Sequence, residues 1–318
     1  MSAGPLSLSC AERHIARVST EPSFSLSCSA QLSRQVVRLS PVPGTSAPQA
    51  RALRVSRRMR KAPVCESGNG AAFVPKKPTL VDIPVSYNGA KCRYIIYSAG
   101  LEDKIDTISP ADLGGLKSPE YLALNPQGKM PALILPAQSG GKPQCIAESE
   151  VVLQYLIEKF CPEHGMGKLS SEQRAIVRQA ARVIDVYTTP IQAASYRQMD
   201  PEVRATNIKE LARQLDILET YVEGPFVLGN DISCADIAIL PTLIWMNFIM
   251  PRFFGWKSIF SGRPKLQSLF EAMQKEPAGA KINGELEAAL SGWEEKGRWK
   301  DVGITDQVAN TSFEWACS

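Results

Sequence analysis

The chain has 318 residues, of which 44% are hydrophobic and 21% charged, and its formal net charge is +4. This composition is typical of a folded protein that buries one or two hydrophobic cores. The chain contains only two histidines, His14 and His164, and none of its eight cysteines forms a CxxC pair. A zinc cluster with several histidines, most Ser-His or Cys-His triads and a dithiol redox site therefore lack the residues that they need. We expect no metal site.

The positive charge is concentrated in residues 1–62, which hold ten arginines and lysines against two acidic residues. This segment carries +8, so the remaining residues carry −4. It is rich in serine and lacks a continuous apolar stretch, which predicts an organellar transit peptide rather than a secretory signal. Abundant serine and proline favour the chloroplast stroma, with the mitochondrion as the alternative. The competing interpretation is a basic arm that binds nucleic acid, but no aromatic residue lies among the arginines of 51–61, so we expect no nucleic-acid partner.

After a linker at 63–78, the pattern predicts an α/β lobe. Its first strand is expected at 79–85, followed by a helix from 87 to 100 in which apolar residues recur at i, i+3, i+4 and i+7. Shorter elements then alternate up to a helix that begins at Ser149: a strand at 105–108, a helical turn at 119–122, and strands at 132–135 and 144–147. This order is that of a thioredoxin-like domain, which we place at 79–161.

Residues 170–296 are predicted to form an all-helical domain beyond a linker with proline and glycine. Ser170 or Ser171 starts a long helix that Pro190 should kink or break, and Pro201 opens the next helix. The residues from 297 to 318 are expected to be a tail of unassigned role.

The most apolar stretch of this domain lies at 237–250, where Pro241 and Asn247 interrupt it. It is too short to span a membrane, so we predict a core helix and expect no membrane insertion. Ser233 and Asp236 precede it as a capping box, a signal for the start of a helix.

The segment from Asn125 to Ser149 points to a site for a small peptide. Pro131 precedes a strand and cannot donate a hydrogen bond, so Met130 should present free backbone groups at a sheet edge, where an extended peptide can pair. Ser149 and the first N–H groups of its helix are expected to bind a carboxylate. Each feature alone also fits an ordinary strand start or helix cap.

On these residues the chain resembles the glutathione transferase superfamily, over about Leu80 to Met273. The family's thioredoxin-like domain carries a cis-proline after a residue like Met130 and an acidic-Ser pair like Glu148 and Ser149. The resemblance implies a set of glutathione contacts: Lys129 with the glycyl carboxylate, the backbone before Pro131 with the cysteinyl unit, Glu148 with the ammonium group and Ser149 with the γ-glutamyl carboxylate.

The resemblance also implies a hydroxyl that stabilises the glutathione thiolate. In serine-type members this serine lies seven positions before the basic residue that begins the inward helical stripe, which here is Arg93, so Ser86 is the candidate. Ser86 would donate a hydrogen bond to the sulfur, because the free thiol, with a pKa of about 8.5, is mostly protonated at neutral pH. Three alternatives stay open: Ser86 only caps the helix, Tyr87 supplies the hydroxyl, or Cys92 takes part.

The predicted function is that of a glutathione transferase, with glutathione as co-substrate and no other cofactor. The second partner is an electrophilic small molecule, and the chain is expected to form a homodimer. Isomerisation or reduction with glutathione is an alternative, although a reductase should have cysteine at position 86. The third possible function is that of a ligand carrier or assembly module without turnover. Four residues are possible pocket walls that fit a core equally well: Tyr187, Tyr196, Trp245 and Met246.

Overall fold

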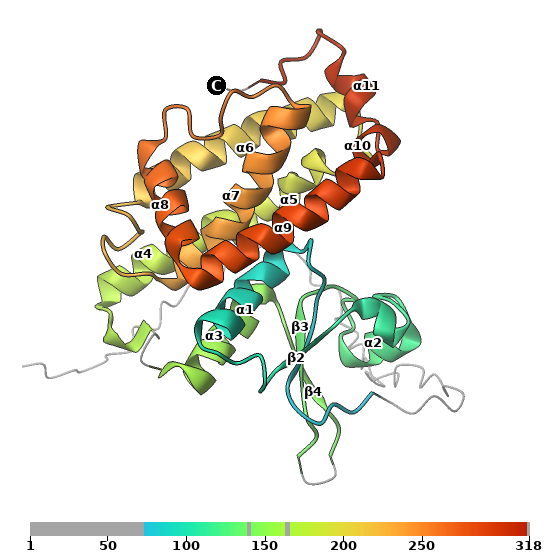
Figure 1. Cartoon of the computed structure of the whole chain (residues 1–318), viewed down its shortest axis with the longest axis vertical. Helices are drawn as coiled ribbons and strands as arrows, with labels where there is room; N and C mark the ends of the chain where they lie inside the picture. The colour runs from blue at the N-terminus through green and yellow to red at the C-terminus, as the bar shows by residue number, and fades with distance from the viewer. Residues whose placement is uncertain (1–72, 139–140, 163–165, 317–318) are drawn as a thin grey trace, which may run out of the picture. The chain divides into compact units, whose positions relative to one another are not determined.

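The computed structural model describes residues 73–138, 141–162 and 166–316, so the proposed transit peptide at 1–62 and His164 lie outside the described residues. The described chain consists of an α/β lobe followed by a helical domain (Figure 1). The predicted fold class, a thioredoxin-like domain followed by an all-helical domain, is confirmed.

The α/β lobe is built on a four-stranded sheet with the strand order β2-β1-β3-β4. Strands β1 and β2 are parallel, and the other neighbours are antiparallel. In chain order the elements are β1 (Thr79–Val81), α1 (Tyr87–Ser98), β2 (Asp106–Ile108), a 3₁₀ turn (Pro110–Leu113), α2 (Pro119–Leu124), β3 (Ala132–Leu135), β4 (Gln144–Ala147) and α3 (Ser149–Phe160).

Strand β1 ends at Val81, four residues earlier than predicted. The strand ends before Asp82. The carboxylate of Asp82 is fully buried and pairs with Arg93 of α1. The segment 82–86 therefore forms a bend that leads into α1 instead of continuing the strand.

The two faces of the sheet bury different cores, because alternate side chains of a strand point in opposite directions. Val81 and Ile134 pack with Tyr121 of α2 in a small core. Leu80 and Leu133 belong to the main core. Helices α1 and α3 cover this second face, between the sheet and the helical domain (Figure 1). The main core continues into the helical domain, so the lobe and the helices share one hydrophobic interior.

The helical domain contains long helices joined by short turns. Its helices are α4 (Ser171–Arg182), a π-helical segment (Val183–Thr188), α5 (Thr189–Gln192), α6 (Pro201–Tyr221), α7 (Cys234–Phe253), α8 (Pro264–Lys275), α9 (Pro277–Glu295), α10 (Arg298–Asp301) and α11 (Ile304–Val308), and short 3₁₀ turns lie at Met166–Lys168 and Ala193–Ser195.

The predicted helix starts are found at their expected places. Ser170 caps α4, Pro201 is the first residue of α6, and Ser233 and Asp236 form the capping box of α7. Asp236 Oδ1 also accepts from the Val227 N–H at 2.8 Å, so the box ties the preceding turn to the helix.

Pro190 does not end its helix. The chain widens into π-helical turns over Val183–Thr188 and continues as α5, which contains Pro190 near its start. A proline has no N–H to donate and tolerates the first turn of a helix, so the distortion falls on the turns before it. Asp185, in the distorted segment, pairs with Lys91 of α1.

Residues 297–316 pack as part of the helical domain, so the predicted boundary at 296 lies too early. Trp299 and Ile304 are buried, and Trp315 is 6% exposed. The indole of Trp299 donates to the Ser195 carbonyl at 3.0 Å, and that of Trp256 donates to the Trp315 carbonyl at 2.8 Å. Burying these large apolar side chains holds the segment against the helices.

Among the described residues, α7 alone is long and apolar enough to cross a bilayer by length and composition, with a mean hydropathy of 1.5 over its most apolar window. It is longer than the apolar stretch predicted from the sequence. Of that window, 89% is buried by the rest of the protein. Its packing is that of the predicted core helix.

Candidate functional site

A cavity of about 1060 Å³ lies between the α/β lobe and the helical domain. The lobe contributes the start of α1, the segment before β3 and the start of α3, while the helical domain contributes residues from 182 to 298. All of the site residues predicted from the sequence line this one cavity: Ser86, Tyr87, Lys129, Met130, Pro131, Glu148 and Ser149.

The segment before β3 is held in place by its backbone oxygen atoms. The peptide bond between Met130 and Pro131 is cis. The Lys129 carbonyl accepts from the Tyr121 hydroxyl at 2.5 Å and from Asn125 Nδ2 at 2.9 Å. These contacts leave the Lys129 ammonium exposed at the cavity. Sequence reasoning missed the two residues that hold this carbonyl, although Asn125 opened the segment that it singled out.

The free backbone groups of Met130 do not arise at a sheet edge as predicted. Strand β3 is an inner strand that pairs with β1 on one side and β4 on the other. The paired register begins at Ala132, after Pro131, so Met130 lies beyond the end of the ladder. A peptide can pair with it there, because the sheet does not extend to that residue.

The Glu148–Ser149 pair stands where β4 turns into α3. Glu148 has a φ of 71°, an uncommon conformation for a residue with a side chain, and its side chain is exposed. Ser149 is the first residue of α3 and is 8% exposed. A carboxylate placed here meets the Ser149 hydroxyl and the free N–H groups of the first helical turn.

A buried lysine lies directly behind Ser149. Lys91 Nζ is 3.5 Å from Ser149 Oγ and 2.5 Å from Asp185 Oδ1, and its side chain is completely buried. Its cation adds positive potential to the anion site at the start of α3, while Asp185 compensates part of its charge. Sequence reasoning did not select Lys91, although a charged residue one helical turn after Tyr87 in a buried helix was the available signal.

Ser86 caps α1, as the structural alternative predicted. Its hydroxyl oxygen accepts from the Gly89 N–H at 3.0 Å. Capping uses the oxygen as an acceptor, whereas thiolate stabilisation uses the O–H as a donor, so one hydroxyl can do both. The hydroxyl also lies near Asp82, whose pKa it lowers. This buried carboxylate is therefore a competing acceptor for the proton of Ser86.

Tyr87 is less suited than Ser86 to stabilise a thiolate. It is 6% exposed, and its ring packs edge-on against Trp245 with 5.1 Å between the ring centroids. Burial raises the pKa of its phenol well above the usual value, and the nearby Tyr196 raises it further. The groups around its hydroxyl, Tyr196 and Thr189, belong to the helical domain.

Cys92 lies deeper. Burial raises the pKa of its thiol strongly, and its sulfur points to the Ser149 carbonyl at 3.6 Å. This is the environment of an inert core thiol.

The helical domain supplies an aromatic wall that the sequence placed only in part. Of the four wall candidates, Tyr196 and Trp245 line the cavity. Tyr187 is 58% exposed and Met246 is 1% exposed in the core, and neither lines the cavity. Trp293 completes the wall; it was missed because it lies beyond the stretch that the resemblance covered.

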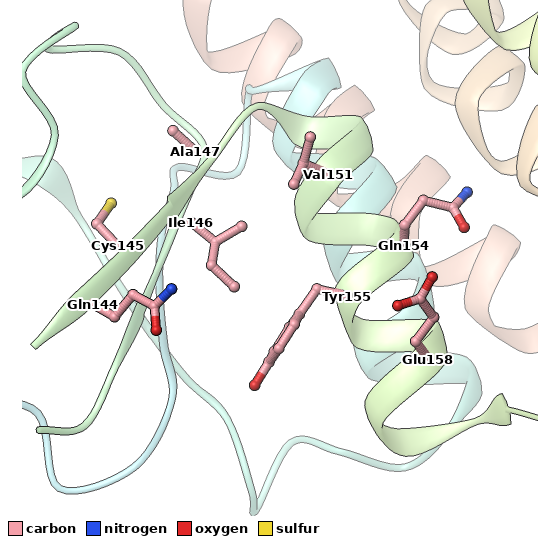
Figure 2. A pocket seen from close by; sticks show the side chains of 8 residues that line it. All are labelled: Gln144, Cys145, Ile146, Ala147, Val151, Gln154, Tyr155 and Glu158. Atoms are coloured by element: carbon pink, nitrogen blue, oxygen red, sulfur yellow. The ribbon is translucent and has the colours of Figure 1, made fainter. Parts of the chain in front are cut away.

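A second, more open hollow lies between β4 and α3. Figure 2 shows the Ile146 and Tyr155 side chains in the space between the strand and the helix, whereas Cys145 points away from it. Val151 lines both this hollow and the large cavity, so the two meet at the start of α3.

Two family models match the chain, one for each domain. The N-terminal domain of glutathione S-transferase matches residues 80–164, and its C-terminal domain matches residues 201–272. The first match contains Ser86, the cis-proline segment and the start of α3, and the second contains the capping box of α7.

Individual proteins are similar to the chain at identities below 30%. A protein from Oryza sativa subsp. japonica described as "Probable glutathione S-transferase DHAR1, cytosolic" is 26% identical over 178 residues, which is 55% of this chain and 75% of that protein. The maleylacetoacetate isomerase maiA of Aspergillus fumigatus is 29% identical over 146 residues, which is 42% of this chain and 61% of that protein.

Solved structures share the fold. A glutathione transferase from Burkholderia graminis, with two glutathione molecules bound per subunit, superposes with a TM-score of 0.53 at 24% identity, covering 66% of this chain and 88% of that one. The glutathione transferase URE2P5 from Phanerochaete chrysosporium reaches a TM-score of 0.57 at 21% identity, covering 70% and 100%. Both domains, in this order and with this topology, place the chain in the glutathione S-transferase superfamily.

Proposed function

We propose that the protein is a glutathione transferase, which binds glutathione between Lys129 and Ser149 and activates its thiol at Ser86 for attack on an electrophilic small molecule. The observation that carries this proposal is the convergence of three separate segments on one cavity: the start of α1, the cis-proline segment and the start of α3. The glutathione bound in the Burkholderia graminis structure supports the choice of peptide.

The chemistry required of the protein is the stabilisation of an anion. A thiol with a pKa of about 8.5 is mostly protonated at neutral pH. A hydrogen bond from the Ser86 hydroxyl and the partial positive charge at the start of α1 both favour the thiolate. The sulfur lone pair then forms a bond to an electrophilic carbon. In substitution the leaving group departs with its electron pair, and in addition the pair moves onto the acceptor, which is later protonated.

The role of Ser86 can be separated from its role as a helix cap. Glycine is a good N-cap, and replacing serine with it costs only a few tenths of a kcal/mol, whereas alanine costs about 1 kcal/mol. Ser86→Gly therefore removes the hydroxyl and leaves the helix nearly as stable. With chlorodinitrobenzene as the electrophile and the full-length chain, we expect Ser86→Gly to lower the conjugation rate about 10- to 100-fold near pH 6.5, the effect of losing one hydrogen bond to a charged group.

The pH profile provides the second measurement. The rate of Ser86→Gly should recover as the pH rises towards 9, because the thiol then ionises without help. Tyr87→Phe, with the neighbouring hydroxyl removed, is the matched control and should keep most of the rate. A full rate in Ser86→Gly together with a lost rate in Tyr87→Phe would transfer the role to Tyr87. Retention of the wild type on immobilised glutathione without any turnover would favour a ligand-binding module.

Glutathione-dependent isomerisation is the second candidate function, favoured by the 29% identity to a maleylacetoacetate isomerase. It uses the same thiolate, which adds to the substrate and is released again without net consumption. The assay that separates the two functions follows glutathione over time, because conjugation consumes it and isomerisation does not. Reduction is disfavoured by the serine at position 86 and by the burial of Cys92, which raises the pKa of its thiol.

A homodimer remains part of the proposal. The open hollow between β4 and α3 is lined by the apolar Ile146, the 52% exposed Val151 and Tyr155, with Gln154 and Glu158 beside them. A second copy seated there would cover Tyr155. We expect the full-length wild type to run as a dimer in size-exclusion chromatography with light scattering, and Tyr155→Glu to run as a monomer. A monomeric wild type would contradict this part of the proposal.

Targeting to the chloroplast stroma, with the mitochondrion as the alternative, is proposed from the sequence of residues 1–62. A fusion of residues 1–70 to a fluorescent protein tests it. Fluorescence confined to plastids is expected, and a diffuse cytosolic signal would rule out a transit peptide.

A further inference from the structure

The part of the cavity next to Ser86 is aromatic. Trp245 donates its indole N–H to the Val85 carbonyl at 3.1 Å, so this ring is fixed to the residue before Ser86. The Trp245 ring has an edge-on contact with Tyr196 at 5.0 Å and with Trp293 at 5.7 Å between ring centroids. The wall therefore begins at the place proposed for the thiol and continues into the helical domain.

Two arginines stand over this wall. The Arg298 guanidinium lies 4.2 Å from the centroid of the Trp293 ring, and that of Arg197 lies 5.6 Å from the centroid of the Tyr196 ring. All four residues line the cavity. Stacking on a ring orients a guanidinium and leaves its N–H edge available to a ligand.

Both arginines can still pair with an anion. Within residues 73–138, 141–162 and 166–316, neither Arg197 nor Arg298 forms an ion pair, and Arg298 Nε is buried without a hydrogen-bond partner. Arg298 donates to one protein group, the Tyr196 carbonyl, at 3.2 Å. The Arg298 guanidinium therefore keeps N–H donors that no protein group among the described residues uses.

The acidic residues of the cavity lie elsewhere. Glu148 and Glu150 belong to the start of α3, and Asp185 already pairs with Lys91. The region of the aromatic wall therefore carries a surplus of positive charge over apolar rings.

From this arrangement we infer that the second substrate is a planar aromatic electrophile that carries a carboxylate, with its ring against Trp293 and Tyr196 and its carboxylate at Arg298 and Arg197. The part of the inference that concerns conjugation rests on the proposed transferase function. The part that concerns binding of the aromatic carboxylate rests on the cavity alone. With a chlorodinitrobenzoate, the thiolate sulfur bonds to the ring carbon that carries chlorine, the C–Cl bond breaks, and chloride leaves with the electron pair. The proton of the thiol passes to solvent.

The test compares chlorodinitrobenzoate with its methyl ester, which has the same reacting carbon and no charge. For full-length wild type and variants, the measured quantity is the ratio of kcat/KM for the carboxylate to that for the ester. We expect Arg298→Gln to lower this ratio by about 10-fold or more, the effect of losing a charge-assisted hydrogen bond. Arg298→Lys keeps the cation and should restore part of the ratio.

Arg252→Gln is the matched control. Arg252 also lies over a ring, 3.9 Å from the centroid of Phe248, in the same domain but outside the cavity. Its replacement should leave the ratio unchanged. An equal ratio in Arg298→Gln and wild type would overturn the inference, and conjugation of both electrophiles would still support the transferase function.

A binding measurement keeps the two ideas separate if no electrophile is turned over. Nitrobenzoate and its methyl ester are titrated into the protein without glutathione, and the quenching of tryptophan fluorescence is followed. Tighter binding of nitrobenzoate than of the ester, lost in Arg298→Gln and kept in Arg252→Gln, would support the substrate class even without turnover. Equal binding of the two by the wild type would refute it.

Discussion

Replacing Arg93 with methionine tests how the segment before α1 is held. Arg93 lies on α1 with its side chain 4% exposed and pairs with the fully buried Asp82. Its Nε donates to Glu285 of α9 at 2.9 Å, and its other nitrogens donate to the carbonyls of Ile83 and Pro84 at 3.0 and 2.9 Å. One side chain thus joins the bend after β1, helix α1 and the helical domain.

The magnitude follows from what would be left unpaired. Removing one partner of a buried ion pair costs about 3–5 kcal/mol, because the other charge stays buried. Glu285 is 26% exposed and can regain water, so most of the loss comes from Asp82. We expect Arg93→Met to lower the free energy of unfolding by about 4 kcal/mol. Adding Asp82→Asn should recover at least about 1 kcal/mol, since a neutral amide needs neither a counter-charge nor the proton that the buried carboxylate must take up.

The loss should also depend on pH. Burial raises the pKa of Asp82 from 3.8 to about 6, although Arg93 lowers it; without Arg93 it rises further. Between the unfolded and folded pKa values the native carboxyl keeps a proton that the unfolded chain has released, so stability falls as pH rises. In the wild type this fall ends near pH 6, whereas in Arg93→Met it continues, by up to about 1.4 kcal/mol per pH unit.

Urea unfolding of the full-length chain, followed by tryptophan fluorescence at pH 6, 7 and 8, measures both effects. The difference between wild type and Arg93→Met should widen from pH 6 to pH 8. Arg213→Met is the control, because the pair of Arg213 with Glu210 is exposed and its loss should cost less than about 1 kcal/mol at every pH. A loss below about 1 kcal/mol in Arg93→Met, or one that does not change with pH, would refute this reasoning.

Three further predictions concern residues of α1, of α9 and of the turn before α3. Gly89→Ala should destabilise the fold, because a Cβ there would collide with the buried Asp82 carboxylate, whereas Gly284→Ala, with open space around it, should stabilise α9 by about 1 kcal/mol; thermal unfolding compares the two. Glu148→Gly should raise stability by about 1 kcal/mol by relieving its positive φ while weakening retention on immobilised glutathione, and unchanged retention would contradict its assignment to the ammonium group. Lys91→Met should cost about 2–4 kcal/mol because its partner Asp185 loses the pairing charge, and calorimetry should show weaker glutathione binding; an unaltered affinity would limit Lys91 to a structural role.

The part of the cavity proposed to bind glutathione was predictable from the sequence as a peptide site, because its signals are local. A proline before a strand, an acidic-Ser pair at a helix start and a hydroxyl before an amphipathic helix each depend on a few neighbouring residues. The structure places these residues on one cavity. The error at the end of β1 has the opposite origin, since the strand stops where Asp82 meets Arg93, eleven residues later.

The second half of the cavity was decided only by tertiary packing. Trp245 reaches the Val85 carbonyl across 160 residues of sequence, and Lys91 reaches Asp185 across 94. Arg298 comes from a segment that the sequence left without a role. Periodicity, caps and prolines determined the domain order and the segments of the predicted peptide site, since these act over one or two helical turns, and the resemblance to the family implied the individual glutathione contacts. The aromatic wall and its arginines required the helical domain to pack against α1, and no local pattern specifies which of its side chains face the cavity.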